Sequence, residues 1–114
     1  MATGDDLRRM ALALEGTIET SHFDRIAYMV ARTYVTLAAD GLSANFKFTP
    51  EDQALKCLTA PDAFTAIANA WGRQGWTNAT LDKLGEAELD SALRSAWADA
   101  QPKKLPPRPP GTLY

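Results

Sequence analysis

The sequence predicts an α+β domain: a curved antiparallel β-sheet with helices packed on one face, including an N-terminal helix and a long C-terminal helix. Three observations support this. β-type segments follow one another along the first half of the chain, helical periodicity marks both ends, and turn residues separate the segments. Strands in a run with helices at the ends indicate an antiparallel sheet rather than a doubly wound one. The predicted order is α-β-β-β-β-α-β-α.

The first predicted helix covers residues 4–14. Its apolar positions recur at the spacing of one buried stripe, as i, i+3, i+4 and i+7. They are Leu7, Met10, Ala11 and Leu14. Thr3 is suited to cap the start of this helix, and Gly16 is suited to end it.

A short β-type segment and then three antiparallel strands are predicted next. Residues 17–20 form a short β-type segment, and a polar link with Phe23 as its buried side chain follows. Residues 26–30 and 33–37 are rich in β-branched and aromatic side chains, and two residues separate them, which is typical of a hairpin. Residues 43–49 alternate strictly, so Phe46 and Phe48 face one side of the sheet and Asn45 and Lys47 face the other.

Two helices and one strand complete the prediction. Thr49 and Pro50 begin a helix whose buried side is expected to contain Ala54, Leu55 and Leu58. Residues 62–70 are interpreted as a loop or a short helix. Residues 76–81 form a further strand, and the last helix runs from about residue 85 to 101, with a broad apolar stripe.

A turn between two tryptophans joins the strand-rich half to the closing helix. Its structural motif is Trp71, Gly72, Gly75, Trp76 and Thr77. Glycine suits a turn that needs a positive φ, so both glycines are assigned that role. The two indoles are interpreted as core anchors for the turn, and the alternative is that they stack on a base or a ligand.

Charge is unevenly distributed along the chain. Residues 1–101 carry nine Lys or Arg against fourteen Asp or Glu, whereas residues 102–114 carry three basic residues and no acidic one. We divide the chain into a single domain, residues 1–105, and a Pro-rich tail, residues 106–114. An acidic body argues against, without excluding, a protein that binds nucleic acid through its overall charge.

Several classes of protein are disfavoured by composition. No apolar run reaches the roughly 20 residues that a membrane span requires, and no signal peptide is evident. The single cysteine, Cys57, cannot form an internal disulfide, so we expect a cytoplasmic protein. His22 is the only histidine, and with one distant cysteine it makes no metal-ligand set. We expect no metal, no cofactor and no enzymatic activity.

Residues 7–105 resemble the MmcQ/YjbR-like family. The resemblance depends most on the Gly-x-x-Gly-Trp-Thr element at residues 72–77 and the Phe-Lys-Phe-x-Pro-Glu run at residues 46–51, in the family's order. Two positions depart from the family pattern, Ile26 and the Ala31-Arg32 turn. The resemblance implies a fold similar to that of secretion chaperones, which has been described as a "double wing" DNA-binding fold.

Two functions remain open for the predicted site. In the first, basic and amide side chains contact DNA phosphates. These residues are Arg25, Arg32, Lys47, Arg73, Gln74, Lys103 and Lys104. In the second, the domain is a protein-interaction module of secretion-chaperone type, and these residues are solvated surface groups.

Overall fold

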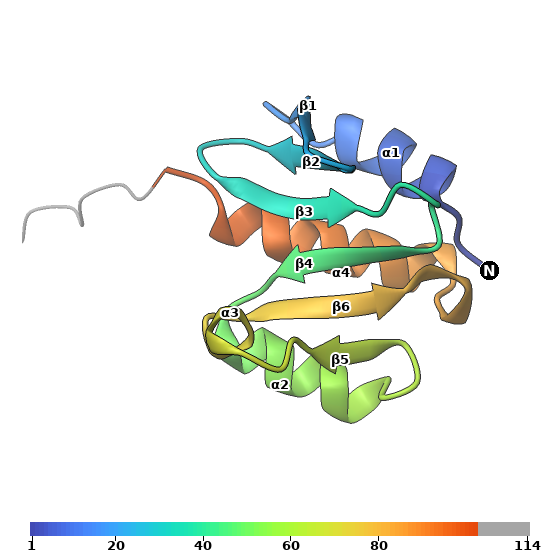
Figure 1. Cartoon of the computed structure of the whole chain (residues 1–114), viewed down its shortest axis with the longest axis vertical. Coiled ribbons are helices and arrows are strands. Elements are labelled where there is room, and N and C mark those ends of the chain that lie inside the picture. The colour runs from blue at the N-terminus through green and yellow to red at the C-terminus, as the bar shows by residue number, and fades with distance from the viewer. Residues whose placement is uncertain (103–114) are drawn as a thin grey trace, which may run out of the picture.

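The sheet is antiparallel and six-stranded, with the strand order β1-β2-β3-β4-β6-β5 (Figure 1). The structure, a computed structural model, describes residues 1–102 of the chain. The strands are β1 (Ile18–His22), β2 (Arg25–Met29), β3 (Thr33–Leu37), β4 (Ser43–Lys47), β5 (Phe64–Ala66) and β6 (Trp76–Thr80). The helical elements are α1 (Gly4–Leu12), α2 (Pro50–Thr59), α3 (Ala70–Arg73), the 3-10 turn η1 (Leu81–Lys83) and α4 (Glu86–Asp99). The predicted α+β class is confirmed.

The long helices lie on one face of the sheet. In Figure 1, α4 crosses behind β3 and β4, and α2 lies behind the β5–β6 edge. Helix α1 packs beside α4. The opposite face, which we call the open face, is turned toward the viewer in Figure 1. Any side chain that the strands direct away from the helices therefore lies on the open face.

The core lies between α4 and the sheet. The rings of Phe46 and Phe48 stack with their centroids 5.5 Å apart, and Phe64 meets both edge-on. Helix α4 contributes Leu89 and Leu93, both fully buried. The strict alternation predicted for residues 43–49 is thus confirmed, because Phe46 and Phe48 face the helices while Asn45 and Lys47 do not.

A bulge in the β2–β3 hairpin adjusts the fit between the sheet and α1. The pairing of β2 with β3 shifts between Tyr28 and Met29, which leaves Tyr34 as the extra residue. Tyr34 and its neighbour Val35 are both fully buried. The Tyr34 hydroxyl lies 2.8 Å from the Thr17 hydroxyl and donates to the Ala11 carbonyl at the end of α1. The bulge therefore attaches the N-terminal helix to the sheet.

Two predictions of local structure were wrong. Residues 62–70 contain β5 and the first residue of α3 rather than only a loop or a helix, because Phe64 is buried in the core and fixes the register Thr65↔Asn78 against β6. In α2, Leu55 is 57% exposed and Leu58 is 78% exposed. The side of α2 nearer the sheet instead carries Gln53 and Cys57, which are half-buried.

The two glycines of the tryptophan turn are required for different reasons. Gly75 has φ of +109°, and a Cβ there would also overlap with the Phe48 carbonyl oxygen. Gly72 does not have a positive φ. A Cβ at Gly72 would overlap with the Ile67 carbonyl oxygen, so close backbone approach, not a positive φ, explains this residue.

We predict that Gly75→Ala destabilises the domain far more than Gly16→Ala. Both glycines have a positive φ, but the nearest atom to a Cβ at Gly16 is 3.7 Å away, on Val30. Gly16→Ala should cost about 1–2 kcal/mol for the backbone conformation alone. Gly75→Ala should cost more than about 3 kcal/mol, because the Phe48 carbonyl must also move. Urea unfolding measures both, and equal costs would contradict the close contact.

A second prediction tests which side of α2 is buried. Leu58→Ala should change the free energy of unfolding by no more than about 0.5 kcal/mol, because the side chain is in solvent. Leu93→Ala in α4 removes a fully buried side chain and should cost about 2–5 kcal/mol. A loss of more than about 1 kcal/mol at Leu58 would show that α2 packs by the face that the sequence predicted.

Candidate functional site

A hollow of about 490 Å³ opens on the open face of the sheet. Its walls come from the β1–β2 hairpin on one side and from residues 67–76 on the other. Its floor comes from β3 and β4. The lining residues are His22, Arg25, Thr33, Thr36, Asn45, Ile67, Trp71 and Trp76. We call this hollow the aromatic hollow.

Strand register places the polar floor of the aromatic hollow. Thr36 of β3 pairs with Asn45 of β4, and Asn45 pairs with Asn78 of β6, so the three side chains share one row across the open face. Asn78 Nδ2 donates to Asn45 Oδ1 at 2.9 Å. The row therefore presents amide and hydroxyl groups, which can both donate and accept hydrogen bonds.

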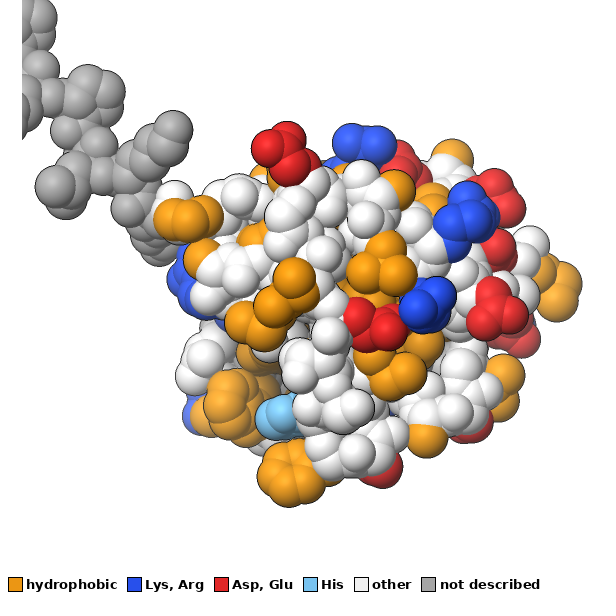
Figure 2. Space-filling model, turned by 90° about the horizontal axis from the view of Figure 1, so that it is seen from above, with side chains coloured by type: hydrophobic (Ala, Val, Ile, Leu, Met, Phe, Trp, Pro, Cys, Tyr) orange, Lys and Arg blue, Asp and Glu red, His pale blue; other side chains and the backbone are white. Residues whose placement is uncertain are grey.

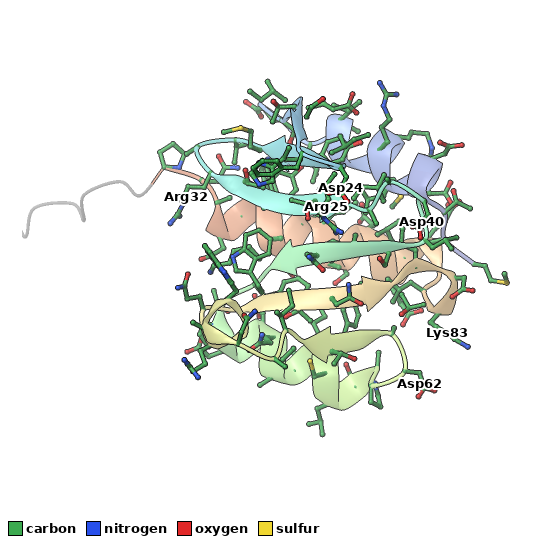
Figure 3. The ribbon with its side chains drawn as sticks, in the orientation of Figure 1. Asp24, Arg25, Arg32, Asp40, Asp62 and Lys83 are labelled. Carbon is green, nitrogen blue, oxygen red and sulfur yellow. The ribbon has the colours of Figure 1, made fainter. Side chains whose placement is uncertain are left out.

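Arg25 is held across the open face. Its Nε donates to the Thr36 hydroxyl at 2.9 Å, and its Nη2 donates to the Thr36 carbonyl at 3.1 Å. Figure 3 shows the side chain reaching from β2 over the neighbouring strand. These bonds use two of the five N–H groups of the guanidinium. Arg25 thus keeps its full positive charge and three further N–H groups at the hollow that it lines.

The hairpin tip carries two exposed rings. Phe23 was predicted to be buried, but it is 95% exposed, and its φ of +58° is that of a tight turn. The His22 ring meets it edge-on, with the ring centroids 5.0 Å apart. Figure 2 shows His22, the only side chain in pale blue, between hydrophobic side chains. The tight turn requires a positive φ at Phe23, and this backbone conformation directs the Phe23 ring into solvent.

Trp71 and Trp76 both face the aromatic hollow. The interpretation of both as core anchors was wrong for Trp71, which is 60% exposed. Trp76 is half-buried, because it alternates with the buried Thr77 along β6. Gln53 of α2 donates to the carbonyls of Gly72 and Trp76, at 2.9 and 3.1 Å. The indoles are thus positioned by backbone contacts and lie beside solvent.

A second hollow, of about 360 Å³, adjoins the first and shares Thr33 and Trp76 with it. We call it the cationic hollow. Its other lining residues are Arg32, Lys47, Gln74, Asp99 and Ala100. Three of the residues that sequence reasoning assigned to phosphate binding, Arg32, Lys47 and Gln74, are thus gathered here by the β2–β3 turn, β4 and the segment before β6. The end of α4 supplies Asp99.

Asp99 occupies part of the cationic hollow. Lys47 Nζ lies 3.9 Å from the Asp99 carboxylate and donates to the Phe48 carbonyl at 3.2 Å. Arg32 Nη2 donates to the Asp99 backbone carbonyl at 2.7 Å, which suits a cation at a helix C-terminus. Two cations therefore face one carboxylate, and the ion pair that involves the carboxylate is a long one.

Basic residues on the helical side are neutralised more completely. Arg8 Nε lies 2.8 Å from Glu19, and Arg94 Nε lies 2.9 Å from Asp90. The hydrogen bond from Arg8 holds the pKa of the Glu19 carboxyl below its usual value. Arg25 and Arg32, by contrast, donate to hydroxyl and carbonyl oxygens. Within residues 1–102, neither Arg25 nor Arg32 forms an ion pair with a carboxylate, and Lys47 forms only the long one with Asp99.

The structure locates most of the predicted site residues. Arg25, Arg32, Lys47 and Gln74 line the two adjoining hollows, and Arg73 is exposed on α3 beside Trp71. Lys103 and Lys104, with the tail 106–114, lie outside the described residues. Sequence reasoning missed Thr36, Ile67 and Asp99. Only the strand alternation that placed Asn45 could have identified Thr36, since the two residues lie on adjacent strands and point to the same face.

Neither a metal site nor a membrane span is found in the part of the chain that the structure describes. Residues 1–102 bring no three His, Cys, Asp or Glu side chains into a metal-binding cluster. None of the helices within this range combines the length and apolar character needed to cross a bilayer.

Comparison with known proteins reports on the fold. No family model matches the chain, and no curated protein matches it by sequence. Among solved structures, it is similar to the Deinococcus radiodurans protein DR2400, which carries the DUF419 domain, with a TM-score of 0.70 and 24% identity. The match covers 84% of this chain and 76% of that one. The similarity shows that the chain has the α+β fold seen in a DUF419 protein. DUF419 is a YjbR/MmcQ-like family.

Proposed function

We propose that the open face binds nucleic acid through its phosphates. The observation that carries the proposal is the adjoining pair of hollows, where Arg25, Arg32 and Lys47 lie beside two tryptophans and face one carboxylate. Phosphate contacts supply most of the affinity of non-specific nucleic-acid binding, and they require only a local cationic surface. An acidic total charge weakens the long-range attraction but leaves these contacts possible.

The direct test is fluorescence anisotropy with labelled random-sequence oligonucleotides, both single-stranded and duplex, over a salt series. We expect micromolar binding at low salt. If three cations neutralise three phosphates of a single strand, log K should fall with log salt at a slope of about −2. Arg32→Glu and Lys47→Glu should each weaken binding and flatten this slope.

Lys83→Glu is the matched control, because it makes the same charge change at an exposed residue of η1. Figure 3 places Lys83 at the opposite end of the sheet from Arg32. Its affinity should stay close to that of the wild-type protein. No anisotropy change at low salt with either form of DNA would refute the proposed function. Equal losses in all three variants would refute the assigned surface.

Asp99→Asn should strengthen binding. The substitution removes the carboxylate that lies 3.9 Å from Lys47, while the backbone carbonyl that accepts from Arg32 remains. Phosphate then has no carboxylate competitor in the cationic hollow, so we expect affinity to rise by several-fold and the salt slope to steepen. General damage to the fold cannot produce this gain. Unchanged or weaker binding in Asp99→Asn would contradict a phosphate site at Lys47.

We propose binding rather than catalysis for this face. His22 is a candidate general base by residue type. The described lining of the aromatic hollow surrounds it with Arg25, hydroxyl, amide and apolar groups, and no carboxylate lies among them to orient or activate it. This arrangement favours a surface that holds a ligand by charge and by ring contact.

The alternative, a protein-interaction module, is favoured by one observation. Leu55 and Leu58 form an exposed apolar ridge on α2, a helix that lies on the face of the sheet opposite the open face. Such a ridge suits the apolar side chains of a protein partner, and a second copy of this chain is the one that can be tested directly. Sedimentation over a range of concentrations should then show a dimer that Leu58→Asp abolishes. A monomer at all concentrations would exclude self-association through α2.

A further inference from the structure

We infer that the nucleic acid bound on the open face is single-stranded, with an unstacked base on Trp71 in the aromatic hollow and a neighbouring phosphate in the cationic hollow. This inference rests on the proposed function and specifies its ligand. The juxtaposition of an exposed indole, a polar floor and a cationic hollow carries it.

Shape is the first reason. Proteins read duplex DNA by inserting a helix or a β-ribbon into a groove, so the reading element is convex. The aromatic hollow is concave, with the hairpin tip and residues 67–76 as its walls. Its volume of about 490 Å³ lies within the range of small-molecule pockets, about 300–1,000 Å³. A nucleotide-sized group can enter such a hollow only when it is not paired and stacked within a duplex.

Exposed aromatic surface is the second reason. The Trp71 indole is 60% exposed at one wall, and His22, which packs edge-on against Phe23, lines the other. Exposing an indole to water leaves a large apolar area uncovered. Bases stack on such rings whatever their sequence, because every base has a π-face. The two walls therefore offer stacking surfaces on either side of the polar floor.

Continuity of the two hollows is the third reason. They share Thr33 and Trp76, so a base in the first hollow lies next to the place where its backbone would meet Arg32 and Lys47. The Asn45 amide and the Thr36 hydroxyl lie on the floor, where they can hydrogen-bond the edge of a base, and Asn78 of the next strand donates to the Asn45 oxygen. An open sheet face that combines stacking rings with polar groups is suited to single-stranded RNA or DNA.

The test compares four labelled oligonucleotides of the same length by anisotropy at low salt. They are single-stranded DNA, its duplex, single-stranded RNA of the same sequence, and a DNA strand that is abasic at successive central positions. Removing a stacked base should weaken binding about 5- to 150-fold. The intact single strand should therefore bind more tightly than both the abasic strand and the duplex. The ratio of RNA to DNA affinity then shows whether the 2′-hydroxyl is contacted.

Variants of the exposed indole give an independent readout. Trp71→Ala should lose about 5- to 150-fold in affinity for the intact strand but little for the abasic one, and Trp71→Phe should retain most of the affinity. Leu58→Ala is the matched control, because it truncates another exposed apolar side chain, on α2 and outside both hollows. Thermal unfolding of each variant confirms that the domain is folded.

The outcomes separate this inference from the proposed function. If the duplex and the abasic strand bind as tightly as the intact strand, phosphate binding stands and base stacking is refuted. Base stacking is also refuted if Trp71→Ala binds the intact strand as tightly as Leu58→Ala does. If no oligonucleotide binds at low salt, both the proposed function and this inference are refuted.

Discussion

Packing of α4 against β3 and β4 determines the character of both faces of the sheet. Phe46 and Phe48 stack against each other in the core, and the buried Leu89 and Leu93 of α4 belong to the same cluster. Because neighbouring residues of a strand point to opposite faces, burying these phenylalanines commits Asn45 and Lys47 to the open face. A slip of one residue in the register of β4 would put the asparagine and the lysine into the core. The same packing that stabilises the domain therefore creates its polar surface.

Backbone contacts then shape that surface into hollows. Gly72 approaches the Ile67 carbonyl and Gly75 approaches the Phe48 carbonyl, so the segment that carries Trp71 lies close against its neighbours. Gln53 holds two carbonyls of this segment from α2. The Trp71 indole needs no core contact to be positioned, because its backbone is fixed from both sides. An exposed tryptophan on a rigid backbone loses little conformational freedom when a ligand covers it.

Sequence patterns predicted the elements whose regular pattern extends over many residues. They failed where contacts between distant segments determine the local structure. The alternation at residues 43–49 and the stripe of α4 both place their side chains correctly, because regular geometry alone determines which face a residue takes. Phe64 was not recognised as part of a strand, since β5 spans three residues and exists only through its pairing with β6. The helical stripe of Leu55 and Leu58 was misleading, because α2 lies at the sheet edge and contacts it mainly through Gln53 and Cys57.

The candidate site was predictable in part. Sequence reasoning chose Arg25, Arg32, Lys47 and Gln74 by residue type and by the family resemblance, and the fold brings them to one face. It did not predict the role of Asp99, because the end of α4 meets the β2–β3 turn only in three dimensions. The exposure of Trp71 was likewise beyond a pattern-based argument, since an indole beside a turn is buried in most proteins.

The three tryptophans allow one measurement to test the central claim. Trp71 and Trp76 line the aromatic hollow, whereas the Trp97 indole donates to the Glu15 carbonyl on the helical side. We would titrate ¹⁵N-labelled protein with a single-stranded oligonucleotide and follow the three indole N–H signals by NMR. The account predicts that the Trp71 and Trp76 signals move while the Trp97 signal stays in place. A shift confined to Trp97, or no shift at any indole, would contradict a nucleic-acid site on the open face.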